Sequence, residues 1–389
     1  MTDKTFCFVS NYLTPHQLPL CLAMVKETKN KFVFIETESL PKERKRLGYP
    51  TLGSQYDFVL NVTESQENLE KALKIAKESS VTIIGSAPDV FIRERLRENK
   101  LTFRFSERIF KKRYFDPLRR VKYTLKNFKY RKKNLFFLLS SAYASHDYKR
   151  CGIRKEKMLK WGYFPEVGQK PFCEIKKEKN KCVWVGRFLS WKHPTDAIEA
   201  VIKLREESFA VEMVMVGVGE TLESAKALVK RKGAEEYIHF VGSQPYEKVR
   251  EFMQKAEIFL FTSDYNEGWG AVLNEAMDSG CAVVASHACG SVPFLIKNNE
   301  NGLIYRYGDN DQLYEQIKKI LIEGHGEVLG EAARETVSKE WNADVAVKKL
   351  ISFCEAFFQG DYAQGVCQEG ILSYAEAISQ QEMYEKGIK

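Results

Sequence analysis

Two glutamates in the stretch YNEGWGAVLNEAMDSG, residues 265–280, have a spacing that suits binding of hydroxyl groups. Glu267 lies in a glycine-containing turn, and Glu275 lies inside the short helix that the pattern predicts before Gly280. A carboxylate in front of a helix can accept hydrogen bonds from one sugar, and one farther along can hold a second sugar such as ribose. The alternative is a first acid that complements the helix dipole and a second acid that is solvated on the outer face.

Two cations follow an earlier apolar strand. Gly186 ends the run CVWVG, Arg187 comes next, and Lys192 lies at the entrance of a helix beside Pro194. Arginine can donate two parallel hydrogen bonds to phosphate oxygens while lysine acts as a point charge, so the pair suits a diphosphate. The alternative is a pair of solvated surface cations.

Backbone groups could complete a phosphate site. Gly217 and Gly219 stand at a strand-to-helix turn, where the missing side chains let a ligand approach backbone amides. The third glycine of the dinucleotide fingerprint is absent, which argues against a dehydrogenase. Further candidate amides lie at the start of the helix that carries Glu275, and they belong to Gly268, Trp269, Gly270, Ala271 and Val272.

The elements that must position these residues repeat along the chain. Short β-branched and aromatic runs alternate with amphipathic helical patterns, which is typical of a parallel sheet with crossover helices. A proline- and lysine-rich stretch at 162–181 interrupts the alternation, which then restarts. The sequence therefore predicts an α/β chain of two doubly wound, Rossmann-like domains that face each other across a ligand-binding cleft. Their expected ranges are 1–165 and 166–340, and C-terminal helices at 341–389 are expected to pack back on the first domain.

Composition agrees with this organisation. A chain of 389 residues, 44% of them hydrophobic, is long enough for two cores. The nine cysteines form no CxxC or Cys/His metal spacing, so we expect reduced core thiols in a cytoplasmic protein. The N-terminus lacks the pattern of a signal peptide, and the most apolar run, residues 135–144, is too short to span a bilayer.

Several segments between about residues 181 and 310 carry a family resemblance, namely VGRFLSWKHPTDAIEAV, VGVGE and the run from FVGSQPYEK to NENGLIY. Together they resemble the C-terminal domain of retaining GT-B glycosyltransferases of family 4, the glycosyl transferases group 1. The E-x7-E element from Glu267 to Glu275 is the most specific part. The resemblance implies a GT-B fold and transfer of a sugar, with retention, from a nucleotide-diphosphate sugar to a glycan or lipid-linked acceptor. It also implies that no metal or other cofactor is required.

The same resemblance implies roles for individual residues. Arg187 and Lys192 neutralise the leaving diphosphate, Glu267 contacts the donor sugar, and Glu275 contacts the nucleotide ribose. Trp269 replaces the phenylalanine that is usual in the family's EGFG, so an aromatic residue is kept. Recognition of the base is expected through backbone groups at residues 241–242, which are Val241 and Gly242.

Other interpretations stay open. The D-x-D pattern of Asp309 and Asp311 holds a metal in other glycosyltransferases, but at the start of a helix Asp309 or Asn310 serves better as an N-cap. Alternative functions are a non-catalytic nucleotide-sugar-binding or scaffold subunit and a GT-B sugar-nucleotide epimerase. A phosphorylase would need a pyridoxal phosphate lysine that the sequence does not identify.

The resemblance weakens before residue 160. Many relatives carry paired glycines after the first strand, where this chain reads SNYLTPHQLPL. Candidate acceptor-side residues in this half are Tyr12, His16, Glu107 and His146. A lone histidine at the end of a strand is more often structural than functional.

A basic segment at 108–133 holds twelve Lys or Arg against one acid, with aromatic residues between them. Such a segment can lie on an anionic membrane surface, which would attach the protein to the inner face of a membrane. Nucleic acid is the rival polyanion, but no known nucleic-acid-binding motif accompanies the run, so we expect no nucleic-acid partner. The third interpretation is a solvated basic loop.

Overall fold

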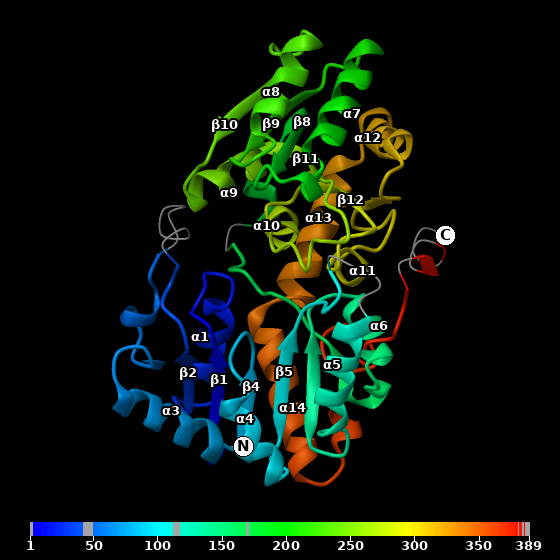
Figure 1. The fold of residues 1–389 in the computed structure, drawn as a ribbon. Helices are drawn as coiled ribbons and strands as arrows, with labels where there is room; N and C mark the ends of the chain where they lie inside the picture. The colour runs from blue at the N-terminus through cyan, green and yellow to red at the C-terminus, as the bar shows by residue number, and fades with distance from the viewer. Residues whose placement is uncertain are drawn as a thin grey trace. The chain divides into compact units, whose positions relative to one another are not determined.

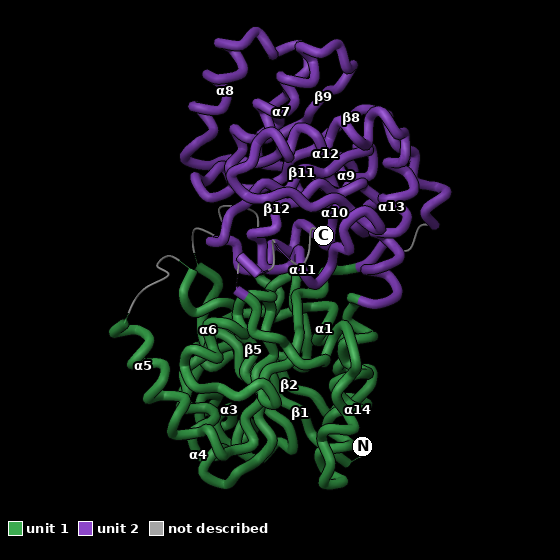
Figure 2. Tube along the Cα trace, turned by 90° about the vertical axis from the view of Figure 1, so that its right-hand side faces the viewer, with its two compact units in different colours: residues 1–166, 341–378 green, residues 167–340, 379–389 purple. Residues whose placement is uncertain are grey.

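The computed structural model describes residues 3–41, 50–111, 117–168, 171–379, 381–382 and 385. The chain divides into two compact units (Figure 2). Unit 1 comprises residues 1–166 and 341–378, and unit 2 comprises residues 167–340 and 379–389. Within the described residues, no helix combines the length and the apolar character needed to cross a bilayer.

Unit 1 is built on a parallel sheet of seven strands in the order β3-β2-β1-β4-β5-β6-β7 (Figure 1). The strands are β1 (Phe6–Ser10), β2 (Phe32–Glu36), β3 (Val59–Asn61), β4 (Val81–Ile84), β5 (Thr102–Ser106), β6 (Leu135–Leu139) and β7 (Met158–Lys160). The helices are α1 (Leu18–Glu27), α3 (Gln66–Glu78), α4 (Val90–Arg97), α5 (Pro117–Phe128), α6 (Ala144–Arg150) and α14 (Ala343–Phe358). The strand order reverses between β1 and β4, so the sheet is doubly wound, as the alternating pattern predicts.

Helices cover both faces of this sheet, which explains why β6 reads as an unbroken apolar run. Phe136 of β6 packs edge-on against Phe353 of α14, at 5.1 Å between ring centroids. Its neighbours Leu135 and Phe137 point to the opposite face and join the cluster that contains Ile92 of α4. A strand that is buried on both faces needs apolar residues at every position.

The segment after α14 differs from the expectation of further helices. Asn342 caps α14 by accepting a hydrogen bond from Val345 N–H (3.0 Å), but residues 367–375 are not helical. Instead, Lys160 N–H donates to the Ser373 carbonyl (2.8 Å), and other backbone bonds tie this segment to β7. The physical reason is that β7 is an edge strand, whose free backbone groups are satisfied by an added extended segment.

Unit 2 is built on a parallel sheet of six strands in the order β10-β9-β8-β11-β12-β13. The strands are β8 (Glu178–Val185), β9 (Glu212–Val216), β10 (Ile238–Gly242), β11 (Ala256–Phe261), β12 (Ala282–Ser286) and β13 (Leu303–Tyr305). The helices are α7 (Pro194–Glu206), α8 (Leu222–Arg231), α9 (Tyr246–Lys255), α10 (Val272–Asp278), α11 (Val292–Leu295), α12 (Asn310–Glu323) and α13 (Gly326–Glu335). The strand order reverses between β8 and β11, so this sheet is doubly wound as well.

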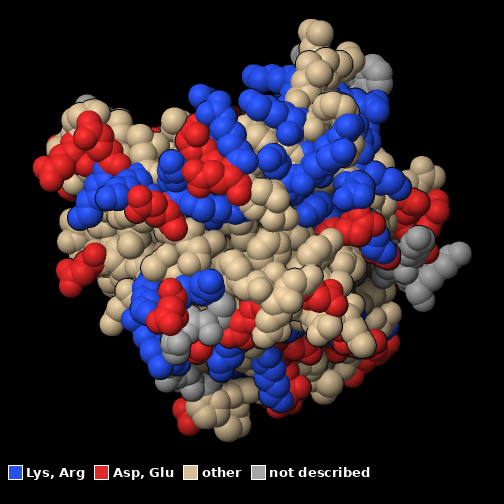
Figure 3. Space-filling view, turned by 90° about the horizontal axis from the view of Figure 1, so that it is seen from below, with Lys and Arg blue, Asp and Glu red and all other residues tan. Residues whose placement is uncertain are grey.

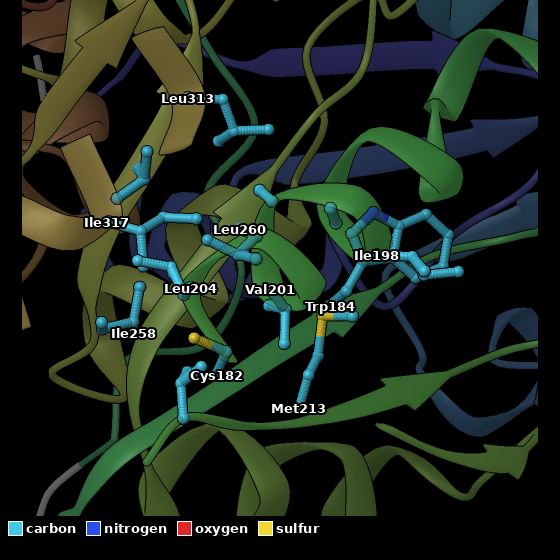
Figure 4. Packing of buried hydrophobic residues seen from close by; sticks show 14 of the residues in the cluster. Cys182, Trp184, Ile198, Val201, Leu204, Met213, Ile258, Leu260, Leu313 and Ile317 are labelled. Atoms are coloured by element: carbon cyan, nitrogen blue, oxygen red, sulfur yellow. The ribbon is translucent and has the colours of Figure 1, made fainter. Parts of the chain in front are cut away.

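The main core of unit 2 lies between its sheet and helices α7, α8 and α12. Figure 4 shows how the strand residues Trp184 and Leu260 face Ile198 and Val201 of α7, with Leu313 of α12 nearby. These side chains are almost completely buried. The core holds the ends of β8 and β11 in fixed positions.

All nine cysteines lie in the described residues, and none of them forms a disulfide. Seven are buried, Cys367 is half-buried and Cys173 is exposed. This agrees with the expectation of reduced thiols that are mostly in the core.

Candidate functional site

The predicted site residues of unit 2 follow the two strands between which the strand order reverses. Gly186 and Arg187 come directly after β8, and Glu267 lies in the loop after β11. Strands β8 and β11 are hydrogen-bonded neighbours in the sheet. Because ligands of doubly wound sheets bind at the carboxyl ends of the strands at such a point, this edge is the candidate site.

Lys192 and Glu267 are brought together at this edge. The Lys192 ammonium group forms an ion pair with a carboxylate oxygen of Glu267, and the two side chains are only 13% and 15% exposed. Two further bonds fix the loops that carry them: Thr262 Oγ1 donates to the Lys192 carbonyl (2.7 Å), and Asp264 N–H donates to the Trp191 carbonyl (2.9 Å). The pair is therefore held in a defined geometry.

Arg187 has a different setting, because its side chain is exposed at the end of β8. Gly186, just before it, lies close to Lys192: a Cβ at Gly186 would be in ordinary van der Waals contact with Lys192 Cδ, at 3.8 Å. The structure thus places Lys192 in a fixed position and leaves the Arg187 guanidinium free to reach a ligand.

The two glycines of the VGVGE turn serve chain packing. Both have a positive φ, and a Cβ at Gly217 would lie 1.9 Å from the Gly186 carbonyl oxygen. A Cβ at Gly219 would lie 2.3 Å from the Phe188 carbonyl oxygen, and Phe188 N–H donates to the Val218 carbonyl (2.9 Å). In the structure, the close approach that these glycines permit is to the loop after β8, and their role in the approach of a ligand stays a prediction.

The turn from Gly268 to Val272 is held by the Trp269 side chain, which is buried. Trp269 Nε1–H donates to Asn274 Oδ1 (2.8 Å), and the Trp269 carbonyl accepts from Ser291 Oγ (2.5 Å). Its indole is only 1% exposed, so the side chain supports the loop from within and does not present a surface to a ligand. The residues beside it, Gly270, Ala271 and Val272, are partly exposed before or at the start of α10.

Glu275 is buried at 6% exposure, which excludes the alternative of a solvated outer face. Burial raises the pKa of this carboxyl to about 7, although the nearby Arg250 guanidinium acts in the opposite direction. Arg250 donates to the backbone carbonyl of Glu275 and forms an ion pair with Asp278. Glu275 and Glu267 therefore have different environments, one desolvated and one paired with a lysine.

The proposed base-binding residues lie at the end of β10. The Val241 carbonyl accepts from Gln244 Nε2 (2.6 Å), and the Gly242 carbonyl accepts from Gly217 N–H (2.8 Å). Gly242 has a φ of +70°, and the pairing with β9 shifts register there. These bonds tie the end of β10 to the turn that contains Gly217.

Sequence reasoning missed His193, which is next to Lys192. His193 has a φ of 47° and its Nε2 lies 3.2 Å from an Asp264 carboxylate oxygen. This hydrogen bond raises the pKa of His193, and burial opposes it. Asp264 lies three residues before Glu267, so the link adds to the bonds that fix the site.

A second histidine, His287 after β12, was also missed. Tyr307 N–H donates to its Nδ1 (3.0 Å), so the neutral ring carries its proton on Nε2, which lies 2.8 Å from the Tyr265 hydroxyl. Burial lowers the pKa of His287 to about 4, and the charge of Arg306 contributes. No spacing in the sequence links His193 or His287 to Glu267; only the fold gathers them at one sheet edge.

The acceptor-side candidates of unit 1 are spread over several elements. Tyr12 follows β1, His16 precedes α1, and His146 lies in α6, all three being half-buried. Glu107 follows β5, forms an ion pair with Lys111 and accepts a hydrogen bond from the Tyr163 hydroxyl (3.1 Å). Burial raises the pKa of Tyr163 well above its usual range, and the Glu107 charge adds to the effect.

The D-x-D pattern has the structural role that its position predicts. Asp309 caps α12 by accepting a hydrogen bond from Gln312 N–H (2.9 Å). Asp311 forms an ion pair with Lys203 of α7 at 2.8 Å. Both carboxylates thus have protein partners.

Comparisons with known proteins agree with this geometry. Residues 169–336 match the family model of the glycosyl transferases group 1. The amylovoran biosynthesis glycosyltransferase AmsK of Erwinia amylovora is 27% identical over 212 residues, which are 53% of this chain and 52% of that protein. A GDP-mannose-dependent alpha-(1-6)-phosphatidylinositol monomannoside mannosyltransferase of Mycobacterium tuberculosis is 25% identical over 183 residues, 45% of this chain and 47% of that protein. The chain thus spans about half the length of the curated relatives it matches.

Similarity to solved structures extends over more of the chain. Alr3699/HepE from Anabaena, solved in complex with UDP, superposes with a TM-score of 0.67 at 16% sequence identity. The match covers 91% of this chain and 100% of that one, so it concerns the fold of both units. The chain therefore has a GT-B fold, and its residues 169–336 are similar to the glycosyl transferases group 1.

Proposed function

We propose that the protein is a retaining, metal-independent glycosyltransferase that moves a sugar from a nucleotide-diphosphate sugar to a glycan or lipid-linked acceptor. The observation that carries the proposal is the ion pair of Lys192 with Glu267 at the point where the unit 2 sheet reverses its strand order. The relatives support the same class of reaction, because two of them are glycosyltransferases by name and HepE was solved with UDP.

The first requirement of this reaction is stabilisation of charge. When the bond between the sugar C1 and the phosphate oxygen breaks, positive charge develops on the sugar ring and negative charge on the diphosphate. Lys192 is held in place by Glu267, so its charge needs no reorganisation as the diphosphate leaves. The exposed Arg187 can donate two hydrogen bonds to phosphate oxygens.

The carboxylates position the donor. A carboxylate has about four acceptor sites, so Glu267 can keep its pair with Lys192 and still accept a hydrogen bond from a donor-sugar hydroxyl. Glu275, which is buried, would accept from the ribose hydroxyls when it is ionised. Neither residue is assigned as an acid or nucleophile of the kind found in glycosidases.

Retention follows if the acceptor oxygen bonds to C1 on the face that the diphosphate leaves. The acceptor hydroxyl then loses its proton to the departing phosphate oxygen, so one bond forms, one breaks and the proton is accounted for. This route requires no covalent intermediate with the protein. Tyr12, His16, Glu107 and His146 of unit 1 remain the candidates for holding the acceptor.

The test is a panel of UDP-, GDP-, ADP- and dTDP-sugars in the presence of EDTA, scored by thermal shift and by release of the nucleoside diphosphate. We expect one donor to stabilise the protein and to be consumed without metal, with turnover lost in Arg187→Ala and Glu267→Ala. Lys203→Ala, which removes a surface lysine from α7, is the matched control and should behave as wild type. Binding without turnover when a full acceptor panel is supplied would favour the non-catalytic binding subunit instead.

A further inference from the structure

Helix α5 (Pro117–Phe128) presents its apolar residues to solvent, whereas Tyr123, Thr124 and Asn127 face the rest of unit 1. Leu118, Val121, Leu125 and Phe128 are 82%, 55%, 68% and 56% exposed, and they are spaced so that they share one face of the helix. Asn127, on the opposite face, is 5% exposed. We call the four exposed residues the α5 apolar face.

The inner face of α5 is anchored, so this orientation is defined. The Tyr123 ring packs edge-on against Phe110 at 6.5 Å, and Arg120 Nε donates to the Arg150 carbonyl of α6 (3.1 Å). Turning the apolar face inward would break these contacts.

The location of α5 makes this arrangement unusual. It connects the neighbouring parallel strands β5 and β6, and a crossover helix normally covers the sheet with its apolar stripe. In unit 1 the buried side chains of Ile109 and Phe110 take part of that role and pack in the core cluster with Phe137 of β6. The α5 apolar face is therefore not needed for the core, and its exposure marks an interaction surface.

Positive charge accompanies this face. The segment 117–133 contains no acid and eight cations, which are Arg119, Arg120, Lys122, Lys126, Lys129, Arg131, Lys132 and Lys133. The Arg131 guanidinium stacks over the Phe128 ring at 3.7 Å, and Lys126 pairs with Asp89 at 2.7 Å. Figure 3, which views the molecule from below, shows lysine and arginine side chains gathered in one broad part of the visible surface. Residues 112–116 of the basic segment lie outside the described residues.

We propose that α5 docks flat on an anionic lipid bilayer. The four side chains of the α5 apolar face would enter the boundary between headgroups and acyl chains, and the flanking lysines and arginines would contact lipid phosphates. A bilayer satisfies both features at once. A nucleic-acid backbone would satisfy the cations but would leave Leu118, Val121 and Leu125 in water.

The test uses the full chain without any nucleotide sugar, so its result does not depend on the proposed reaction. Co-sedimentation is measured with phosphatidylcholine vesicles and with vesicles that contain 30 mol% phosphatidylglycerol. We expect binding at least about tenfold tighter to the anionic vesicles, because each cation near the surface contributes roughly a factor of five. In the Leu118→Ser/Leu125→Ser variant, binding should fall at least about tenfold, because burial of a leucine side chain contributes at least that factor.

Two control variants match the test variants. Ile322→Ser/Val328→Ser removes two apolar side chains of unit 2 that are 64% and 67% exposed, and it should bind vesicles as wild type does. The test variant Lys122→Glu/Lys129→Glu changes two cations of the basic segment and should lose binding. Its control is Lys230→Glu/Lys232→Glu, which changes two exposed lysines around the end of α8. An unchanged melting temperature shows that each variant is folded, since all these side chains are at the surface.

Three results would overturn the proposal. One is equal, negligible binding to both kinds of vesicle. Another is binding to anionic vesicles that the Leu118→Ser/Leu125→Ser variant retains in full, since that would be a purely electrostatic attraction. The third is binding to single-stranded DNA that is tighter than binding to vesicles and abolishes vesicle binding in competition, which would assign the surface to nucleic acid. A Phe128→Trp variant supplies an independent reading, with an expected blue shift of its emission on anionic vesicles.

Discussion

Lys192 and Glu267 are 75 positions apart in the sequence, and their side chains form an ion pair between the loops that follow β8 and β11. The pair links a cation suited to a phosphate with a carboxylate suited to a sugar hydroxyl. Any ligand that binds at this edge meets both charges together. The four predictions below begin with this pair.

Removal of Lys192 should reduce both stability and activity. Lys192→Ala leaves the Glu267 carboxylate largely buried without its counter-charge, and we expect a cost of about 2 kcal/mol in the free energy of unfolding. Turnover should fall about 100-fold or more, as for loss of one group that stabilises a developing charge. Denaturant titration and initial rates measure the two effects. Lys203→Ala, which removes an exposed pair, should change neither, and a comparable loss there would argue against a special role for Lys192.

Nucleotide binding should depend on the ionisation of Glu275. Burial raises the pKa of this carboxyl to about 7, so only above that pH is it fully able to accept two hydrogen bonds from ribose. We expect the affinity for the preferred nucleoside diphosphate to increase as the pH rises through 7 and the dependence to vanish in Glu275→Gln. Calorimetric titration between pH 5.5 and about 8.5 measures it.

A ligand control separates this effect from titration of the phosphate itself. The 2′,3′-dideoxy form of the same nucleotide has no ribose hydroxyls but keeps the phosphates. The pH dependence of its affinity should reflect only the titration of the phosphate, in both the wild type and Glu275→Gln. An identical pH profile for the ribose and dideoxy forms would remove Glu275 from the ribose site.

Glu275 and His287 should affect stability with opposite dependence on pH. The pKa of Glu275 is raised from 4.5 to about 7, so its burial becomes unfavourable as pH rises through this range. The pKa of His287 is lowered from 6.5 to about 4, so its contribution is present above 6.5 and is lost as pH falls toward 4. Each shift corresponds to about 3 kcal/mol, and in the wild type the two largely offset each other between these limits.

Single substitutions should reveal the two contributions. The stability of the wild type relative to His287→Asn should increase from pH 4 to 6.5, whereas its stability relative to Glu275→Gln should decrease from pH 4.5 to 7. Asparagine can still accept a hydrogen bond from Tyr307 N–H, so the comparison isolates the charge. Melting temperatures across this range suffice, and parallel curves for the two variants would contradict the assignment.

Substitution of Gly217 should be far more harmful than substitution of a glycine in open space. Gly217→Ala would place a Cβ 1.9 Å from the Gly186 carbonyl oxygen, so the two loops must separate. Gly233, also at positive φ, has no atom within 4 Å of its Cβ position, so Gly233→Ala should cost only about 1 kcal/mol. We expect Gly217→Ala to lose at least about 3 kcal/mol and most nucleotide binding. Equal effects of the two variants in denaturation would show that the loop contact is not important.

The arrangement of strands and helices was predictable, because it rests on local patterns. Runs such as LFFLL and AVVA are apolar throughout, as strands buried on both faces must be, and the segments between them have helical periodicity. The position of Arg187 and Glu267 at one edge of the sheet could also be predicted from the sequence, since each comes after a strand of the same parallel sheet.

The environments of the site residues were not predictable from local patterns. The sequence does not show that Lys192 pairs with Glu267, because that contact depends on how two distant loops meet. The burial of Trp269 and the reason for Gly217 likewise depend on the neighbouring chain segments. Glu275 is a partial exception, since the apolar residues around it, Leu273, Ala276 and Met277, already indicate a buried helix.

The composition of α5 predicted a charged surface but not its orientation. An amphipathic helix between two parallel strands is expected to turn its apolar face toward the sheet. The inverted orientation depends on Ile109 and Phe110, which lie before the helix in the sequence and take part of that place. A one-dimensional pattern contains no information on which of two apolar segments will cover the sheet.

The way in which the chain returns to unit 1 affects the order of events during its synthesis. Helix α14 and the segment that bonds to β7 belong to unit 1 but come after unit 2 in the chain. As the polypeptide leaves the ribosome, residues 167–340 can therefore complete their fold before Phe353 is available to pack against Phe103 and Phe136. Synthesis of unit 1 thus begins before that of unit 2, but unit 1 completes its fold later. In the interval, the apolar sheet face that α14 will cover stays accessible to chaperones.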